Sequence, residues 1–536
     1  MRAASTSPVV GGIASLGFVG LLAAGAFAGL LVEGAGDLRS AVAGFDAYLL
    51  RVAGFTLRQA LLSTLVSVGP AMLVARALSR HPAFIGRRAL LMLFALPLAL
   101  PALVAALGVL ALLGRAGFAA GFFGWIGGGQ WPGIYGLPGI LVAHAFFNLP
   151  LATRLFLHAL DAIPADQWRL ASQLGMGTGA RWRLIEWPVL RATLPGVAGL
   201  VFMLCLASFT IVLTLGGGPA ATTLEVAIYQ SLRFDFDPAR ALALTMLQLG
   251  LTALVLTLLL RLGADLGGDA SLSVAARRYE TPSRLATGFD AAAVLLAAIL
   301  VAGPLLAILA AGLRADLGRL ATEGAVRDAV ATSLVLAGLS AVLCVVLTLS
   351  MARTRHRLAA ARRGTRPGFA ERALDTGAGL ILVVPPIVIG AGWFILLRQV
   401  ADVFALAPVM VVTVNAAMAI PFATRAIRPA HDDAAIRHDR LCAQLGIGGF
   451  DRWRLIDWPV LRRPLATGFA FAMALSLGDL GVIALFGSDA VQTLPYLLFQ
   501  RMGSYRTADA AGLALILALL CLCLMMAAER LGGRKT

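Results

Sequence analysis

Apolar runs long enough to cross a lipid bilayer recur from one end of the chain to the other. A span needs about 20 predominantly apolar residues, because the hydrocarbon core of a bilayer is about 30 Å thick. Twelve runs meet this requirement, and they predict an all-α membrane protein with about 12 transmembrane helices. The runs cover 9–32, 56–79, 89–114, 136–158, 195–215, 240–262, 289–312, 328–352, 374–398, 406–428, 464–487 and 508–529.

Composition supports this class and excludes others. The chain is 59% hydrophobic and 13% charged, whereas soluble domains contain about 25% charged residues. The net charge of +16 does not indicate a nucleic-acid partner, since the arginines lie in short loops between apolar runs. The five cysteines have no metal-binding spacing and imply no disulfide framework, so we expect core thiols.

Arginine placement predicts the orientation. The loop from Arg353 to Arg372 contains seven arginines, whereas 115–135 contains only Arg115. Loops rich in arginine remain on the cytoplasmic side of a membrane. We therefore expect a multi-pass protein embedded in the lipid bilayer, with both termini in the cytoplasm.

A loop segment is printed twice. Residues 169–191 and 440–462, offset by 271 positions, are identical at sixteen of twenty-three places without a gap. Each copy accompanies six apolar runs, and an even number makes both copies enter the membrane in the same direction. The sequence predicts two parallel six-helix repeats, 1–270 and 271–536, with coupling loops at 161–191 and 432–462.

Each copy predicts a small apolar projection beside the membrane. A short helical stretch ends at a glycine, and an arginine- and tryptophan-rich stretch suited to the headgroup region follows. The alternative is an interfacial helix that only anchors the bundle. The candidate residues of the first copy are Leu170, Ala171, Leu174, Gly175, Met176, Ile185 and Pro188. Those of the second are Leu441, Cys442, Leu445, Gly446, Ile447, Ile456 and Pro459.

The loops resemble the signature of the permease subunits of binding-protein-dependent ABC importers. That signature reads E-A-A, three residues, G, nine residues, then I-x-apolar-P; Gly175, Ile185 and Pro188 match it, as do Gly446, Ile456 and Pro459. The E-A-A part departs, because arginine stands in place of the glutamate in both copies. The resemblance implies the type I ABC importer permease fold and a docking role for both loops.

Within that family the chain is similar to the thiamine and thiamine pyrophosphate permeases of proteobacteria, over nearly its whole length. The resemblance implies import of thiamine and its phosphate esters, with ferric iron as the alternative. The residues that carry it are 144–150, 202–205, 216–230, 237–240, 476–479 and 493–495.

The implied partners are two copies of an ABC ATPase at the cytoplasmic face and a periplasmic thiamine-binding protein, with one fused permease chain per complex. A phosphate-binding ATPase loop needs a lysine, and Lys535 is the only one in this sequence. We therefore expect a transport subunit rather than an enzyme, with no catalytic residue, metal or bound cofactor of its own. ATP and Mg²⁺ would be used by the partner ATPase.

Several polar residues are candidates for the transport pathway or for contact with the binding protein: Asn148, Gly217, Glu225, Asn415 and Asp479. Buried polar groups in membrane helices mark such pathways, but they also join helices by hydrogen bonds. An ion-coupled secondary transporter is the alternative from another class. It would show ionisable groups deep in several helices, and often inverted repeats, and neither pattern is found.

Overall fold

The computed structural model describes residues 7–36, 47–261, 283–362, 367–380, 384–488 and 491–532. Within these ranges all regular elements are helices, apart from an isolated bridge between Ser488 and Val491. Ten of these helices are long and apolar enough to span a membrane, and a bent helix pair makes up to eleven. The predicted all-α membrane fold is confirmed. The repeat boundary at 270 and the arginines at 277, 278 and 534 lie outside the described residues.

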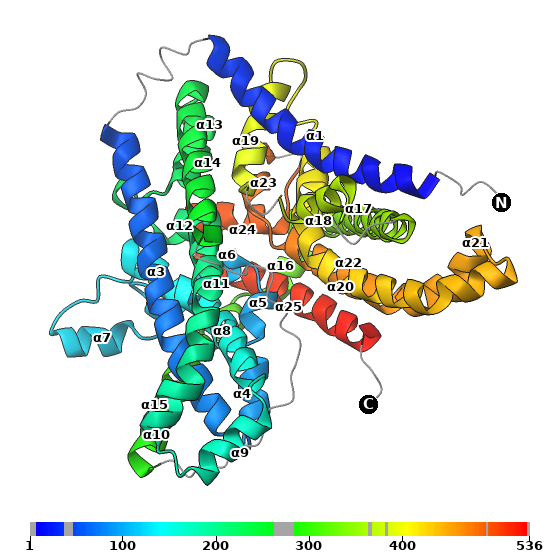
Figure 1. The fold of residues 1–536 in the computed structure, drawn as a ribbon. Helices are drawn as coiled ribbons and strands as arrows, with labels where there is room; N and C mark the ends of the chain where they lie inside the picture. The colour runs from blue at the N-terminus through cyan, green and yellow to red at the C-terminus, as the bar shows by residue number, and fades with distance from the viewer. Residues whose placement is uncertain are drawn as a thin grey trace. The chain divides into compact units, whose positions relative to one another are not determined.

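The chain forms two compact units that do not follow the two sequence repeats. Unit 1 comprises Met1–Gly44, Ile228–Thr245 and Ala315–Thr536, and unit 2 comprises Phe45–Ala227 and Met246–Arg314. Each unit therefore contains the first long helix of the opposite repeat, which Figure 1 shows by colour. The repeats describe the sequence, and the units describe the packing.

The helices of unit 1 are α1 (Ser7–Gly36), α16 (Leu317–Thr322), α17 (Gly324–Ala361), α18 (Phe369–Leu380), α19 (Pro386–Leu397), α20 (Ala407–Leu445), α21 (Gly449–Arg452), η3 (Trp453–Asp457), α22 (Trp458–Leu477), α23 (Gly481–Phe486), α24 (Leu494–Gly503) and α25 (Thr507–Gly532).

The helices of unit 2 are α3 (Ala47–Arg80), α4 (Arg87–Leu93), α5 (Leu96–Ala99), α6 (Ala102–Leu113), α7 (Ala120–Gly127), α8 (Leu137–Asp161), α9 (Ala165–Gln173), α10 (Thr178–Arg181), η1 (Trp182–Glu186), α11 (Trp187–Leu206), α12 (Phe209–Leu215), η2 (Pro219–Ala221) and α15 (Arg284–Leu313). Two further helices, α13 (Leu224–Arg233) and α14 (Pro238–Arg261), have residues in both units.

In unit 1 the helix α1 packs against α17 and α19. The crossing with α19 is very close, since a Cβ on Gly29 would lie 2.1 Å from the Gly392 carbonyl oxygen. The Trp393 indole donates a hydrogen bond of 2.8 Å to the Leu22 carbonyl at the same crossing. Small residues allow membrane helices to approach closely where no hydrophobic force distinguishes a neighbouring helix from lipid.

In unit 2 the helix α3 packs against α8, α11 and α15, and α15 also packs against α6. The core between them is almost wholly apolar and includes Phe146, Phe156 and Leu190, all fully buried. A Cβ on Gly108 of α6 would meet the Pro304 carbonyl oxygen of α15 at 2.6 Å. The first long helix of the second repeat is therefore an integral part of this unit.

The third and ninth expected spans are interrupted. The run 89–114 is a pair of helical segments bent by 115°, because Leu100 precedes Pro101 and is held extended with φ −97° and ψ 140°. The run 374–398 contains α18 and α19, and residues 381–383 between them lie outside the described part of the chain. The prediction of one continuous helix over 89–114 was therefore wrong.

Candidate functional site

The two coupling segments, residues 169–191 and 440–462, share the same order of backbone elements. A helix ends at a glycine in the left-handed region, Gly175 with φ +59° or Gly446 with φ +67°. A four-residue helix follows, then a π-helical turn, η1 or η3, and then a membrane helix that starts at Trp187 or Trp458. The glycine end predicted for the first helix of each segment is confirmed, and the π-helical turns were not foreseen.

Each coupling segment presents exposed leucines one turn apart. Leu170 and Leu174 are 56% and 68% exposed, and Leu441 and Leu445 are 48% and 63% exposed. Gly175 and Gly446 are also exposed, whereas Met176 and Ile447 are partly buried. Paired leucines on a protein surface are suited to a partner that covers them.

The remaining candidate residues of the segments differ in burial. Ala171 and Cys442 are buried, because they face away from the exposed leucines on their helices. They therefore do not contribute to the expected apolar projection. Ile185 and Ile456 are partly buried, and Pro188 and Pro459 are exposed at the first turn of the following helix.

An arginine near the end of a long helix holds each segment in place. In unit 2, Arg76 Nε of α3 lies 2.5 Å from Glu186 Oε2, and its guanidinium lies 4.3 Å from the Trp182 ring centre. In unit 1, Arg353 Nη2 of α17 lies 3.7 Å from Asp457 Oδ2 and its guanidinium lies 4.6 Å from the Trp453 ring centre. These arginines were not predicted, although both acids and both tryptophans recur at the 271-residue offset.

The helices that lead into the segments differ. In the first repeat α8 ends at Asp161 and α9 starts after Pro164, whereas in the second α20 runs unbroken to Leu445. Ala435 corresponds to Pro164, so the second repeat lacks the proline that separates α8 from α9 in the first. Asp439 of α20 then pairs with His356 at 2.9 Å and with Arg452 at 2.6 Å, which ties the unbroken helix to its segment.

Inside unit 2, a polar cluster surrounds a break in a membrane helix. The expected span 195–215 is interrupted at Ala207 and Ser208, between α11 and α12. His144 of α8 bridges two hydroxyls there, with Nδ1 2.7 Å from Ser63 Oγ and Nε2 2.8 Å from Ser208 Oγ. Asn148 donates to Cys205 Sγ at 3.2 Å, one turn from His144.

Unit 1 contains a corresponding cluster. The expected span 464–487 is interrupted between α22 and α23, and Asp479 lies in the break rather than in a helix. Its carboxylate accepts hydrogen bonds from the Gly481 and Val482 amides at 3.1 and 3.3 Å. Asn415 of α20 donates to Ser476 Oγ at 3.0 Å, and Ser476 donates to Ser340 Oγ at 3.3 Å.

The two clusters occupy matching positions in the repeats. His144, Cys205 and Ser208 correspond to Asn415, Ser476 and Asp479 at the 271-residue offset. A further contact matches as well: the Leu224 amide donates to Thr56 Oγ1 at 3.0 Å, and the Leu494 amide donates to Ser333 Oγ at 2.7 Å. The sequence singled out Asn148, Asn415 and Asp479, but not the serines or the bridging role of His144.

Gly217 and Glu225 lie beyond the cluster of unit 2, after α12. Gly217 has φ +71° in the turn before η2, which glycine adopts without strain. Glu225, in the first turn of α13, is 1% exposed and its Oε1 lacks a hydrogen-bond partner among the described residues. Burial raises the pKa of Glu225 to about 8, so its neutral form is favoured near neutral pH.

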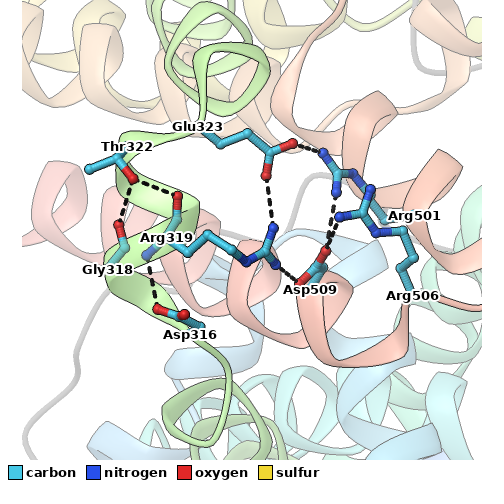
Figure 2. Close-up of polar contacts among 8 residues, drawn as sticks. All are labelled: Asp316, Gly318, Arg319, Thr322, Glu323, Arg501, Arg506 and Asp509. Atoms are coloured by element: carbon cyan, nitrogen blue, oxygen red, sulfur yellow. Dashed lines mark hydrogen bonds and ion pairs between the residues drawn. The ribbon is translucent and has the colours of Figure 1, made fainter.

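The start of α25 in unit 1 has a charged network of its own, which Figure 2 shows. Arg501 of α24 pairs with Glu323 and with Asp509, the latter at 3.1 Å. Arg319 of α16 pairs with the same two carboxylates, at 3.4 Å from Glu323. The network joins α16, α24 and α25 with Glu323, the residue immediately before α17. It was not foreseen from the sequence.

Comparison with known proteins agrees with the repeat. The family described as "Binding-protein-dependent transport system inner membrane component" matches residues 67–266 and 358–535. The "Thiamine transport system permease protein ThiP" of Brucella abortus (strain 2308) is 58% identical over 531 residues, which is 99% of this chain and 96% of that protein. The proteins of the same name from Salmonella typhimurium (strain LT2) and Escherichia coli (strain K12) are 44% and 43% identical, over 91% of this chain and 90% of each relative.

The matched regions lie one in each repeat, and each includes one coupling segment. The chain therefore belongs to the family of binding-protein-dependent transport system inner membrane components, a family of membrane transport permeases and not of enzymes.

Proposed function

We propose that this permease imports thiamine and its phosphate esters from a periplasmic binding protein into the cytoplasm. The proposal for the substrate is supported by relatives that are named thiamine transport permeases and match 91–99% of this chain. The proposal for the driving force is carried by one observation, the paired exposed leucines that both coupling segments present beside a left-handed glycine.

Each coupling segment would receive one ATPase subunit, so that two ATPases act on one fused permease chain. ATP and Mg²⁺ are bound by those subunits, and the permease binds no cofactor. Closure of the ATPases on ATP moves both segments. Arg76 and Arg353 then transmit the movement to α3 and α17 through their ion pairs and tryptophan contacts.

The orientation follows from the arginine-rich loops. The coupling segments and both termini are in the cytoplasm, the membrane is the bacterial inner membrane, and the binding protein docks on the periplasmic side. The network around Arg501 and the turn at Gly217 belong to that outer side.

Each interrupted helix would present polar groups to the transported substrate within its own unit. Irregular backbone at membrane depth is tolerated only where protein covers it or where it lines a polar cavity. Both breaks are next to polar side chains, His144 and Ser208 in one repeat and Asn415 and Asp479 in the other. Asn148, Gly217 and Glu225 extend the polar surface of the first repeat, and Asp479 supplies an anion suited to the thiazolium cation of thiamine.

The coupling role is tested with the variant Gly175→Val/Gly446→Val. Both glycines have positive φ and open space around them, so valine strains only the turn. We expect the variant to insert normally but to lose capture of the ATPase and ATP-driven uptake of labelled thiamine in proteoliposomes. Normal uptake would contradict the docking role.

The matched control is Gly177→Val/Gly448→Val. These glycines lie two residues further along each segment, also in open space, but have negative φ of −71° and −145°. We expect the control to capture the ATPase and to import thiamine at the wild-type rate. Equal loss in both variants would show that bulk, rather than the turn, disturbs the segment.

The substrate is tested by growth of a deletion strain. We expect the gene to restore growth on limiting thiamine and not on limiting ferric iron. Rescue by iron alone would replace thiamine with the ferric-iron alternative. Uptake by the permease chain alone, driven by an ion gradient, would indicate a secondary transporter.

A further inference from the structure

A cavity of ≈470 Å³ opens at the start of α4 in unit 2, away from the coupling segments and both polar clusters. Its lining includes two adjacent arginines, Arg87 and Arg88, and the apolar side chains of Phe84, Leu91 and Met92. No carboxylate contributes to the lining. The cavity therefore combines two positive charges with an apolar wall.

The two arginines are available to a ligand. Among the described residues, the structure records no carboxylate partner for Arg87 or Arg88, and Arg87 Nε has no hydrogen-bond partner. Asp290 of α15, a helix that packs against α4, is already engaged. Asp290 Oδ2 lies 3.4 Å from Arg80 Nη1 and 3.2 Å from His81 Nε2.

The apolar wall indicates what kind of anion fits. Phe84 and Met92 are exposed, and the neighbouring Ile85 is fully exposed. Such side chains are costly in water and favourable against hydrocarbon. The helix α4 leads directly into the bent apolar segments α5 and α6, so the cavity lies where a membrane-crossing segment begins.

We propose that this cavity binds one anionic phospholipid of the cytoplasmic leaflet. The planar guanidinium groups of Arg87 and Arg88 would hold the phosphodiester, and an acyl chain would lie along Leu91 and Met92. Basic pockets at the cytoplasmic ends of membrane helices suit anionic headgroups. In Figure 1, α4 lies at the same end of unit 2 as α9 and α10, which agrees with the proposed cytoplasmic side.

The test uses the full purified chain, freed of lipid in detergent and titrated with dioleoyl phosphatidylglycerol or dioleoyl phosphatidylcholine, with native mass spectrometry to count bound lipids. We expect one phosphatidylglycerol to bind at least tenfold more tightly than phosphatidylcholine. The variant Arg87→Gln/Arg88→Gln should weaken phosphatidylglycerol binding by about tenfold or more. The variant Arg87→Lys/Arg88→Lys should weaken it by only about threefold, since charge is kept and the planar fork is lost.

The matched control is Arg462→Gln/Arg463→Gln, a second pair of adjacent exposed arginines that does not line the cavity. It removes the same charge and should leave the affinity unchanged. An equal loss in the control would overturn the site, because the effect would then be one of net charge.

Soluble glycerol 3-phosphate distinguishes a lipid from a free phosphate. We expect it to compete with phosphatidylglycerol at least a hundredfold less well, since it lacks acyl chains. Competition at equal concentration would overturn the lipid as occupant. If the ATPase subunit covered Arg87 and Arg88 and the chain did not prefer phosphatidylglycerol, a protein contact would replace the lipid as the occupant of the cavity. These outcomes do not depend on whether the coupling segments capture an ATPase.

Discussion

The two repeats have diverged to different extents in different regions. At the coupling segments, sixteen of twenty-three residues are identical, and both copies share the left-handed glycine, the π-helical turn and the contact with an arginine of a long helix. Around α24, Arg501 of the second repeat joins a network of five charged side chains, whereas Ser231 stands at the corresponding place of the first repeat when 223–230 is aligned with 493–500. The fused chain has kept the coupling segments alike and the charged region different.

The polar clusters are intermediate between these extremes. Their positions match, but a histidine and a serine in one repeat correspond to an asparagine and an aspartate in the other. The first cluster is neutral in composition, and the second includes a carboxylate. The helix break is thus preserved while the chemistry beside it is not.

The charged network around Arg501 offers the largest expected effect. Arg501→Ala leaves Glu323 and Asp509 with one fewer cation in a mostly buried position, and should destabilise the protein by about 3 kcal/mol. The control Arg506→Ala removes a 48% exposed arginine that also contacts Asp509, and should cost below about 1 kcal/mol. Thermal unfolding in detergent measures both. Similar losses in the two variants would remove the contrast with the first repeat.

The bridging histidine should be the second most sensitive position. His144→Ala leaves the hydroxyls of Ser63 and Ser208 without their partner and should cost about 2 kcal/mol. Asn415→Ala removes one hydrogen bond and should cost about 1 kcal/mol. The same unfolding assay compares them. A larger loss at Asn415 would mean that the second cluster is the more constrained of the two.

Glu225 should make stability depend on pH in the first repeat. Its counterpart in the second repeat, Pro495 when 223–230 is aligned with 493–500, cannot ionise. Its folded pKa is raised to about 8 from 4.5, so folding is least penalised below about pH 4.5 and stability falls as the pH rises toward 8. Glu225→Gln should therefore raise the free energy of unfolding at pH 8.5, seen as a higher unfolding temperature, and leave it nearly unchanged at pH 5.

The control for this experiment is Asp166→Asn, an exposed carboxylate in α9 of the same unit. We expect it to leave the pH dependence of the unfolding temperature as it is in the wild type. If Glu225→Gln and Asp166→Asn behaved alike, the buried carboxyl would not be the source of the pH dependence of stability.

The smallest expected difference concerns the arginines that hold the coupling segments. Arg76→Lys and Arg353→Lys keep the charge but lose the planar contact with tryptophan. Arg76→Lys should reduce ATP-driven uptake by about threefold, and Arg353→Lys by less than about twofold. Arg76 should matter more, because its ion pair is 2.5 Å long against 3.7 Å for Arg353. Initial uptake rates in proteoliposomes measure both, and a reversed order would show that the second segment is the more tightly held.

Much of this arrangement could be predicted from the sequence. Apolar runs located the membrane helices, and Gly175 and Gly446 located the turns of the coupling segments, because only glycine readily adopts positive φ. The proline pair at 97 and 101 carried the signal for the bend of the third span, but a hydropathy count does not register it.

Other features left no local signal. The break after α11 occurs at Ala207 and Ser208, which lack the glycine or proline that usually marks such a site. His144 meets Ser63 and Ser208 across 81 and 64 residues, and a single sequence does not record such contacts. The exchange of first helices between the units could not be predicted either, since α1 and α15 are apolar over most of their surface and that pattern does not identify a neighbour.

That exchange has a consequence for biogenesis. The Gly12 amide of α1 bonds to Thr354 Oγ1, which stands 342 positions later in the chain. At ribosomal speeds of about 5–20 residues per second, roughly 20–70 s pass between synthesis of the two residues. During that interval the newborn helix is surrounded by lipid or held by the insertion machinery, and unit 1 closes only when translation has nearly finished.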